Sequence, residues 1–235
     1  KTWINKTPKP YLLFLKVLDE YFQDRDDNKV LMPKEFSSGQ LFNVKYQEDA
    51  ILRGIDIIKK HQGVIVADVV GLGKSIIAAT AAYNITKDTD YKILIIAPPH
   101  LTEQWEEYQV QFRLPGARVW SRGQLENIEI NHDDKLLIII DEVHGLKNEE
   151  TIRYRKLHKI CHSNPKNKTI LLTATPFSNS PSDIFALVKL FQVPGASTIQ
   201  TVENLSQEFR RIITEWDKIN RDKKNRDDSK ELNEI

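Results

Sequence analysis

Short apolar runs recur through the middle of the chain, and longer amphipathic stretches separate them. Four runs have the length of strands: residues 64–67, 93–96, 136–140 and 169–172. Because none of them alternates apolar and polar positions, each predicts a strand buried on both faces, as in a parallel sheet. The amphipathic stretches predict helices: residues 75–86, 102–112 with Thr102 as N-cap, 149–161 and 182–191. This alternation predicts an α/β fold, with a mostly parallel central sheet covered by helices on both faces.

The two ends of the chain follow a different pattern. Residues 1–40 predict an N-terminal helical extension, with its helix at residues 11–22, and residues 41–200 form the α/β domain. Residues 201–235 are a separate C-terminal segment, with an amphipathic helix predicted at 202–219. The following stretch, 220–234, is almost wholly charged or polar, so we expect it to be frayed or disordered.

The composition is that of an ordinary soluble protein, with 40% hydrophobic and 29% charged residues among 235. No signal peptide is visible and no apolar run approaches the roughly 18 residues of a membrane span, so we expect a cytoplasmic protein without a membrane partner. The single cysteine, Cys161, excludes an internal disulfide and fits a reducing compartment. The net charge of +1 does not decide for or against nucleic acid, because phosphate binding needs local positive charge.

The strongest chemical signal is the segment 67–75, Ala-Asp-Val-Val-Gly-Leu-Gly-Lys-Ser. It follows a predicted strand and begins a predicted helix, so its backbone N–H groups and the helix dipole favour a bound phosphate. In such a loop Lys74 contacts the β- and γ-phosphates of a nucleotide and the Ser75 hydroxyl holds Mg²⁺. The general template has glycine where Asp68 stands, so for the loop alone a glycine-rich turn without a ligand is the alternative.

A second signal follows the apolar run at 136–140, where Asp141 and Glu142 are adjacent. A carboxylate at the end of a buried strand beside a phosphate loop can bind the metal, and we predict this role for Asp141. We predict that Glu142 orients or activates the attacking water. The alternative is that the two acids only cap the next turn. His144 is either an ordinary turn histidine or a residue that couples the site to its surroundings.

Two other groupings are interpreted as structural. His158, Cys161 and His162 have helical spacing, but zinc needs four ligands and nothing nearby completes the set, so we expect surface and packing roles. Residues 147–168 carry seven Lys or Arg and two acidic residues, which is typical of a solvated helix face.

Five motifs, in order and in content, resemble the Swi/Snf-type branch of the superfamily-two helicases. Tyr46-Gln47 resembles the upstream glutamine motif, and residues 68–75 resemble the family's phosphate loop, which itself begins with Asp. Residues 96–99 with 101–105 resemble the third motif. Residues 141–144 are similar to the DEXH signature, and residues 172–176 resemble the motif that links hydrolysis to movement. The resemblance covers roughly residues 42–191.

The resemblance implies a RecA-like P-loop NTPase lobe that binds ATP and Mg²⁺ and moves along nucleic acid, usually double-stranded DNA. It implies adenine recognition by the Gln47 amide. The other implied nucleotide-binding residues are Asp68, Gly71, Leu72, Gly73, Lys74 and Ser75, with Ser75 and Asp141 on the metal. Coupling roles are implied for His144, Thr173 and Thr175, and nucleic-acid contacts for Pro99, His100 and Thr102, with Arg153, Arg155 and Lys156 as lesser candidates. We expect contacts to phosphates rather than to base edges, because a motor steps along any sequence.

In this family a second RecA-like lobe supplies an arginine finger and half of the nucleic-acid track. No such motif follows residue 191, so we expect the chain to be truncated before that lobe. We also expect it to bind Mg·ATP but to hydrolyse it slowly, because an arginine finger contributes about 10³ to 10⁵ in rate. Val69 and the Pro98-Pro99 pair depart from the family pattern. Residues 10–16 with Val69-Val70 resemble a bacterial subgroup in which a phospholipase-D-like nuclease domain precedes the motor.

Other classes of function fit these residues less well. A metabolic kinase or other phosphate-loop NTPase would not need Gln47 or the motif at 173–175. A decayed nucleotide-binding scaffold should lose Lys74, Asp141 or Glu142 first, and all three are present. An RNA helicase, unwinding in place of translocation, and a role in DNA restriction or repair stay open, because family likeness alone favours duplex DNA.

Overall fold

The computed structural model describes residues 30–36, 41–69, 71–114, 116–176, 180–199 and 204–231, with side chains as far as residue 221. The chain divides into two units, Lys1–Val30 and Leu31–Ile235. Apart from Val30, everything described below belongs to the second unit. The helix predicted at residues 11–22 lies outside the described residues.

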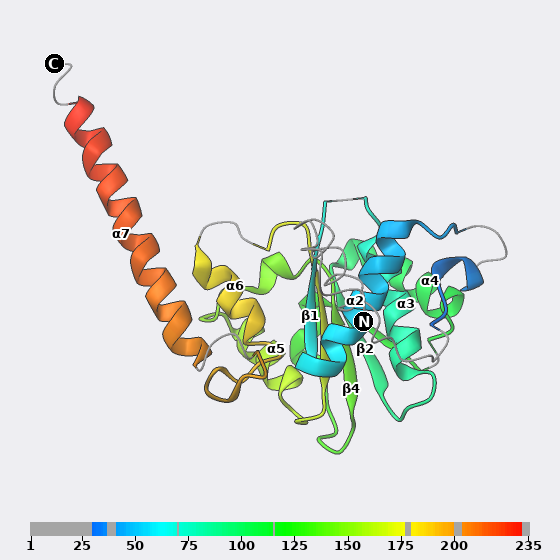
Figure 1. Ribbon diagram of the computed structural model, residues 1–235. Coiled ribbons are helices and arrows are strands. Elements are labelled where there is room, and N and C mark those ends of the chain that lie inside the picture. Colours follow the sequence, from blue (N-terminus) through cyan, green and yellow to red (C-terminus); the bar gives the residue numbers. More distant parts are fainter. Residues whose placement is uncertain are drawn as a thin grey trace, which may run out of the picture. The chain divides into compact units, whose positions relative to one another are not determined.

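Five parallel strands form the sheet at the centre of the second unit (Figure 1). They are β1 (Gly63–Ala67), β2 (Lys92–Ala97), β3 (Arg118–Ser121), β4 (Leu136–Ile140) and β5 (Lys168–Thr173), in the spatial order β1-β5-β4-β2-β3. The four predicted strands are confirmed, and each begins and ends within one residue of the predicted position. The sequence did not predict β3, because its four residues are only half-buried or exposed and form no continuous apolar run.

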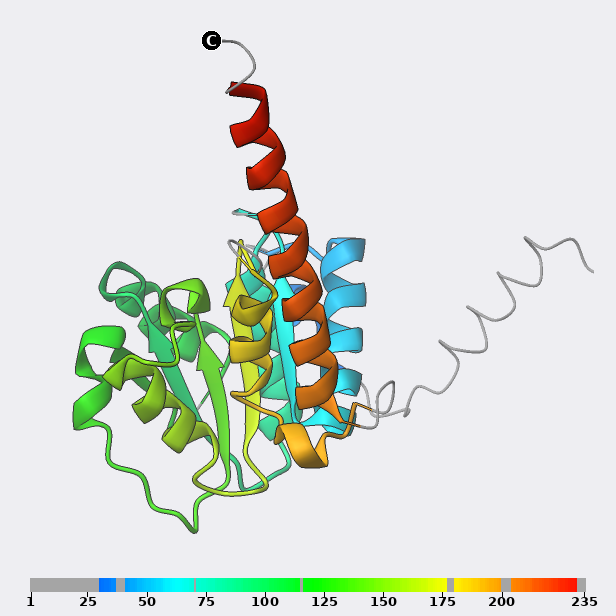
Figure 2. The same ribbon diagram turned by 90° about the vertical axis from the view of Figure 1, so that its left-hand side faces the viewer.

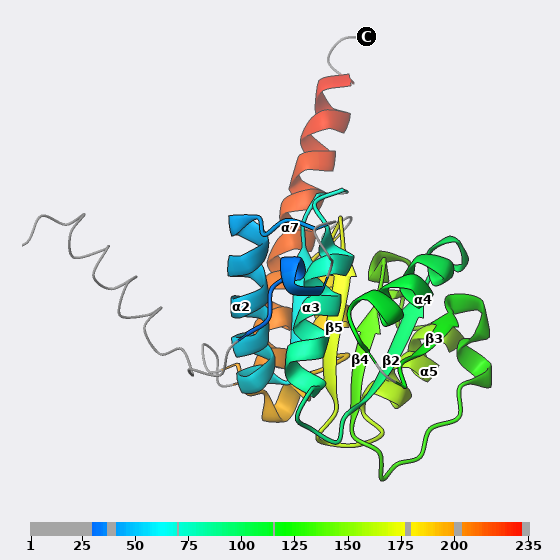
Figure 3. The same cartoon turned by 90° about the vertical axis from the view of Figure 1, so that its right-hand side faces the viewer.

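Helices cover both faces of the sheet (Figures 2 and 3). On one face, α2 (Lys45–His61), α3 (Lys74–Thr86) and α4 (Thr102–Gln111) contact the strands. On the other, α5 (Ile152–Cys161) and α6 (Pro181–Val188) pack into a core with alternate residues of β2 and β4, such as Leu94, Ile96 and Ile138. All five residues of β4 are buried, which explains why this central strand reads as an unbroken apolar run. The predicted α/β, RecA-like fold class is confirmed.

Several helix starts and ends differ from the prediction. Thr102 lies inside α4, with Leu101 as the N-cap, and its hydroxyl donates to the Pro99 carbonyl at 2.8 Å. The helix α5 begins three residues later than expected, because Thr151 is the N-cap and its side-chain oxygen accepts from the Tyr154 N–H. Ser180 caps α6, which begins one residue before the predicted start and ends at Val188, before the predicted end.

The C-terminal helix, α7, runs over Leu205–Glu231. The predicted fraying at residues 220–234 is therefore wrong as far as Glu231, where the backbone continues the helix despite its polar composition. The helix packs against α6, and the rings of Phe185 and Phe209 stack with centroids 4.4 Å apart. Among the described residues, none of the helices is both long enough and apolar enough to cross a membrane.

Short 3-10 segments follow several strands at the edge where the motifs lie. They are η2 (Pro99–Leu101) after β2, η3 (Arg122–Asn127) after β3 and η4 (Val143–Leu146) after β4. Two further segments, η1 (Pro33–Phe36) and η5 (Pro194–Ala196), lie elsewhere along the chain. Phe36 of η1 packs its ring against Tyr83 of α3 and against Phe112, which joins residues 31–36 to the domain.

Candidate nucleotide site

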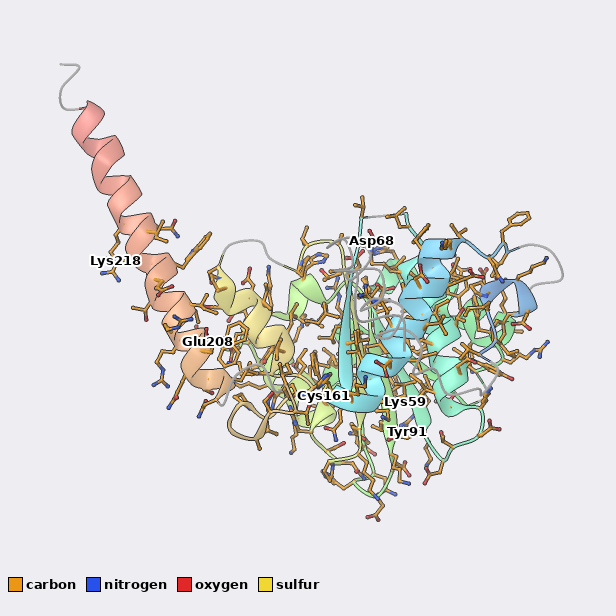
Figure 4. The ribbon with its side chains drawn as sticks, in the orientation of Figure 1. Lys59, Asp68, Tyr91, Cys161, Glu208 and Lys218 are labelled. Carbon is orange, nitrogen blue, oxygen red and sulfur yellow. The ribbon has the colours of Figure 1, made fainter. Side chains whose placement is uncertain are left out.

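The predicted motifs meet at the edge of the sheet where the parallel strands end. Asp68 follows β1 and lies at this edge, while Tyr91 precedes β2 and lies at the opposite edge (Figure 4). In open parallel sheets, ligands bind outside the carboxyl ends of the strands. The arrangement therefore gathers the loops after β1, β2, β4 and β5 where a nucleotide is expected.

The phosphate loop turns through two glycines and leads directly into α3. Gly71 and Gly73 have φ angles of 89° and 79°, which a residue with a Cβ adopts only at a cost. The Lys74 side chain is buried, and its Nζ donates to the carbonyls of Asp68 at 2.9 Å and Val69 at 3.1 Å. A buried ammonium needs anionic or strongly polar partners. The loop thus holds a cation beside the N-terminus of α3, where the dipole also favours a phosphate.

The glutamine motif contacts this loop. The Gln47 side chain is buried, and its Nε2 donates to the Leu72 carbonyl at 3.2 Å. The Tyr46 hydroxyl donates to the same carbonyl at 2.9 Å. A Cβ at Gly73 would collide with the Gln47 amide, so the glycine is needed for this close approach as well as for its φ angle. The structure therefore brings Gln47 to the loop, a contact that the sequence analysis did not predict; its contact with adenine stays a prediction.

Asp141 directly follows β4, and both of its carboxylate oxygens accept hydrogen bonds. Its Oδ2 accepts from the Ser75 hydroxyl at 3.3 Å and from the indole N–H of Trp105 at 2.9 Å. Its Oδ1 accepts from the Glu142 N–H at 2.8 Å. Burial raises the pKa of the Asp141 carboxyl, and the hydrogen bond from Trp105 opposes this shift. Ser75 and Asp141, predicted as the magnesium ligands, thus lie side by side with oxygen donors, which Mg²⁺ prefers.

Trp105 is a residue that the sequence analysis did not place in the site. It is fully buried in α4, and its partner Asp141 lies 36 positions further along the chain. A buried tryptophan usually needs an acceptor for its N–H, and this was the one available signal. Sequence gives no means of choosing Asp141 as that acceptor.

Glu142 is partly exposed, as a residue that activates water needs to be. Its φ angle of 48° lies in the left-handed region, which costs a non-glycine residue about 1 to 3 kcal/mol unless the surroundings hold it. Side chains and backbone both contact this residue: His144 Nδ1 lies 3.0 Å from the Glu142 carboxylate, and the Glu142 carbonyl accepts from the Arg122 guanidinium at 3.1 Å and from the Gly145 N–H at 3.4 Å. His144 therefore contacts Glu142, the residue predicted to activate water, and this contact fits its predicted coupling role. Arg122 is a second residue that the sequence analysis missed.

The segment after β5 joins the phosphate loop through its backbone. The Thr173 carbonyl accepts from the Asp68 N–H at 3.3 Å, and the fully buried Thr173 hydroxyl accepts from the Thr175 N–H at 3.1 Å. Thr175 itself is exposed. Thr173 is therefore one hydrogen bond from the start of the loop, and Thr175 is linked to it through Thr173.

The predicted nucleic-acid contacts lie on separate elements at the same edge. Pro99 and His100 are exposed on η2, while Thr102 begins α4 and is half-buried. Arg153 and Arg155 of α5 are exposed and Lys156 is half-buried. Among the described residues, none of this group has a hydrogen bond to the phosphate loop, so the group is separate from it.

Cys161 lies away from Asp68 and the candidate site (Figure 4). Cys161 is buried in the core cluster, and burial raises the pKa of its thiol to about 12. His162 Nε2 lies 2.8 Å from the Lys189 carbonyl, and the His158 and His162 rings are 4.3 Å apart. These contacts belong to the packing of α5 against the segment after α6, which agrees with the surface and packing roles expected for the three residues.

Two families match the chain in adjacent stretches. The SNF2-related domain matches residues 124–235, and the res subunit of type III restriction enzymes matches residues 42–117. An uncharacterized ATP-dependent helicase of Bacillus subtilis, YqhH, is 33% identical over 159 residues, which are 59% of this chain and 28% of that protein. The TATA-binding protein-associated factor MOT1 of Saccharomyces cerevisiae is 27% identical over 189 residues, 64% of this chain and 10% of that protein. The chain thus spans well under half the length of these relatives.

Among solved structures, the chain resembles the Sulfolobus solfataricus SWI2/SNF2 ATPase core in complex with dsDNA. The TM-score is 0.58 at 19% identity, over 79% of this chain and 45% of that one. The ATPase core domain of the same organism gives a TM-score of 0.53 at 20% identity, over 71% of this chain and 37% of that one. At these identities the likeness establishes the fold, and it agrees with the sheet and helices described above.

Proposed function

Because the chain belongs to the Swi/Snf-type branch of the superfamily-two helicases, as a RecA-like lobe, we propose that it binds Mg·ATP for a nucleic-acid-dependent ATPase that translocates along duplex DNA. A second RecA-like lobe of the same protein would complete the ATP site and the DNA track. The chain's 45% share of the length of the Sulfolobus ATPase core is consistent with one lobe of two.

The observation that carries the proposal is the contact between the phosphate loop and the DEXH segment. The Ser75 hydroxyl and the Asp141 carboxylate come from β1–α3 and β4 and lie 3.3 Å apart. Lys74 is buried in the loop beside them. A glycine-rich turn without a ligand would not need this neighbouring carboxylate, whose burial raises its pKa and disfavours its charge. A bound cation removes that penalty.

In this proposal each residue has a definite role. Lys74 exchanges its two carbonyl partners for the β- and γ-phosphates, which are stronger acceptors. Ser75 and Asp141 hold Mg²⁺, which supplies charge stabilisation for phosphoryl transfer. Glu142 accepts a hydrogen bond, and then a proton, from the attacking water. Trp105 keeps the Asp141 carboxylate in its orientation.

The proposed nucleic-acid track lies at the same edge of the sheet as the ATP site. The Sulfolobus core was solved with dsDNA, and the exposed Pro99 and His100, with the half-buried Thr102, lie at the edge of the sheet that carries the ATP site. The nearby arginines of α5 add positive charge there, which phosphate binding requires. We therefore favour duplex DNA, with RNA as the outcome that would redirect the proposal.

The test is steady-state ATP turnover by the full-length protein with no nucleic acid, duplex DNA, single-stranded DNA or RNA. Stimulation by duplex DNA that disappears in Lys74→Ala is the expected result. Stimulation by RNA alone would replace the DNA translocase with an RNA-dependent motor. Absence of turnover under every condition would favour the scaffold alternative instead.

A further inference from the structure

A hollow of about 420 Å³ lies beside the DEXH segment, at the edge of the sheet that also carries the phosphate loop. Its lining comes from η2, η3, η4 and α5: Pro99, Arg122, Gly123, Gly145, Leu146 and Arg153. The described lining contains two arginines and no acidic residue. Its two glycines leave the backbone uncovered. These are the properties of a site for an anion.

The two arginines have different surroundings. Arg153 is exposed and makes no hydrogen bond or ion pair with any described residue. Arg122 is partly buried, and its single described hydrogen bond goes from Nη1 to the Glu142 carbonyl at 3.1 Å. A guanidinium carries several N–H donors in a fixed plane, so the remaining donors of Arg122 can serve a ligand in the hollow.

Gly145 makes the Arg122 contact possible. A Cβ at this position would collide with Nη1 of Arg122, and the other atoms near it also belong to that guanidinium. The φ angle of Gly145 is not in the left-handed region, so the backbone would accept alanine. Gly145→Ala therefore displaces the guanidinium from the Glu142 carbonyl while keeping its charge in the protein.

We propose that this hollow binds a backbone phosphate of the nucleic acid and that Arg122 is a positioning residue that transmits its occupancy to Glu142. The inference rests on the proposed nucleic-acid-dependent ATPase. A phosphate held by Arg122 and Arg153 fixes the guanidinium plane, because an arginine–phosphate pair is geometrically specific. The fixed guanidinium then holds the Glu142 carbonyl, and with it the strained main chain that aims the Glu142 carboxylate.

Without the phosphate, the Glu142 carbonyl keeps the long contact from the Gly145 N–H at 3.4 Å, while the Arg122 bond comes from a long, partly exposed side chain whose position nothing else in the hollow fixes. All the residues of the ATP site are then present, but the Glu142 carboxylate is not held in its productive position. A small misplacement of a catalytic group lowers the rate of hydrolysis strongly. Nucleic acid would thus stimulate hydrolysis through Arg122 without touching the nucleotide.

The experiment compares ATP turnover with and without a mixed-sequence duplex DNA, in the full-length protein, for the wild type and four variants. Arg122→Lys keeps the positive charge but loses the planar set of guanidinium donors, and Gly145→Ala moves the guanidinium away from the Glu142 carbonyl. We expect both to lower the maximal stimulation by roughly tenfold, the effect of losing one charge-assisted hydrogen bond. Arg118→Ala, in the exposed part of β3 outside the hollow, is the matched control and should keep the wild-type stimulation.

Duplex affinity and its salt dependence separate positioning from binding. Arg153→Ala should weaken binding and lower the slope of log K against log salt by about one, while saturating DNA restores full stimulation. Gly145→Ala should lose stimulation even when the duplex is saturating, so that a loss of affinity cannot account for it. Should Arg122→Lys fail to fold, Gly145→Ala decides alone, because only a flexible side chain must move.

Full stimulation of Gly145→Ala would overturn the inference and leave the proposed function intact. A wild type that no nucleic acid stimulates would overturn both.

Discussion

The indole of Trp105 is fully buried and donates to Asp141 Oδ2 at 2.9 Å, so replacing it perturbs the metal side of the site from within the core. Trp105→Phe keeps an aromatic ring in place and removes the donor. A hydrogen bond to a charged group contributes about 1.5 to 3 kcal/mol. The smaller ring leaves a void that costs on the order of 1 kcal/mol more. We expect the free energy of unfolding to fall by about 2 to 4 kcal/mol.

The effect on the site follows from the other contacts of the same carboxylate. After the change, Oδ2 keeps only the Ser75 hydroxyl at 3.3 Å, and the orientation of the carboxylate is less well defined. The pKa of Asp141, already raised by burial, rises further because the Trp105 bond no longer opposes the shift. Mg·ATP binding should weaken by about 10- to 100-fold, equivalent to the hydrogen bond lost, and the deficit should grow as the pH falls.

The assay is binding of a fluorescent ATP analogue titrated with Mg²⁺ at several pH values, together with unfolding in urea. Phe112→Leu is the matched control, because Phe112 is fully buried at the end of the same helix and makes no described contact with Asp141. It should lower stability while leaving Mg²⁺ dependence unchanged. If Trp105→Phe behaves in the same way as this control, the hydrogen bond does not position the carboxylate and the reasoning is refuted.

Three further predictions concern stability. Asp141→Asn should raise the melting temperature of the nucleotide-free protein at neutral pH, because burial destabilises the charged carboxylate and thereby raises its pKa. The gain should vanish at a pH below the carboxyl's unfolded-state pKa, and a lower melting temperature at neutral pH would contradict the reasoning. Thr80→Val should stabilise the protein by up to about 1 kcal/mol in urea unfolding, because the buried Thr80 hydroxyl has no partner among the described residues, and destabilisation would imply a hidden one. Asn167→Ala should lower the free energy of unfolding by about 2 to 4 kcal/mol in the same assay, because this buried amide accepts from the Leu136 N–H at 2.8 Å and donates to carbonyls at the end of α5. A decrease under about 1 kcal/mol would mean that water replaces these bonds.

The features that the sequence predicted well are those that depend on local pattern. Continuous apolar runs located β1, β2, β4 and β5; for the inner strands β2, β4 and β5 the reason is that a strand buried on both faces must be apolar along its length, whereas β1 lies at the sheet edge and is only partly buried. The phosphate loop and the DEXH segment are also local, and the parallel fold brings them to one edge. That fold was predictable from the alternation of strands and helices.

The features that the sequence missed depend on tertiary contacts or on short, mixed segments. Strand β3 has only four residues and one fully exposed end, so pairing with β2 rather than its own pattern defines it. The contacts of Trp105 with Asp141 and of Arg122 with the Glu142 carbonyl join positions 36 and 20 residues apart. The Thr102 cap was misplaced because η2 precedes α4 directly, and the turn then begins before the threonine.

The most direct test of the central claim compares Lys74→Ala and Glu142→Gln with the wild-type, full-length protein at saturating duplex DNA, measuring ATP binding and ATP turnover separately. The account predicts that Lys74→Ala loses both, because the loop has lost the cation that contacts the phosphates. Glu142→Gln should bind ATP with wild-type affinity and hydrolyse it at least about 100-fold more slowly, because general-base catalysis contributes about 10² to 10⁴. Wild-type turnover in Glu142→Gln, or wild-type ATP binding in Lys74→Ala, would contradict the assignment of this edge of the sheet as the ATP site.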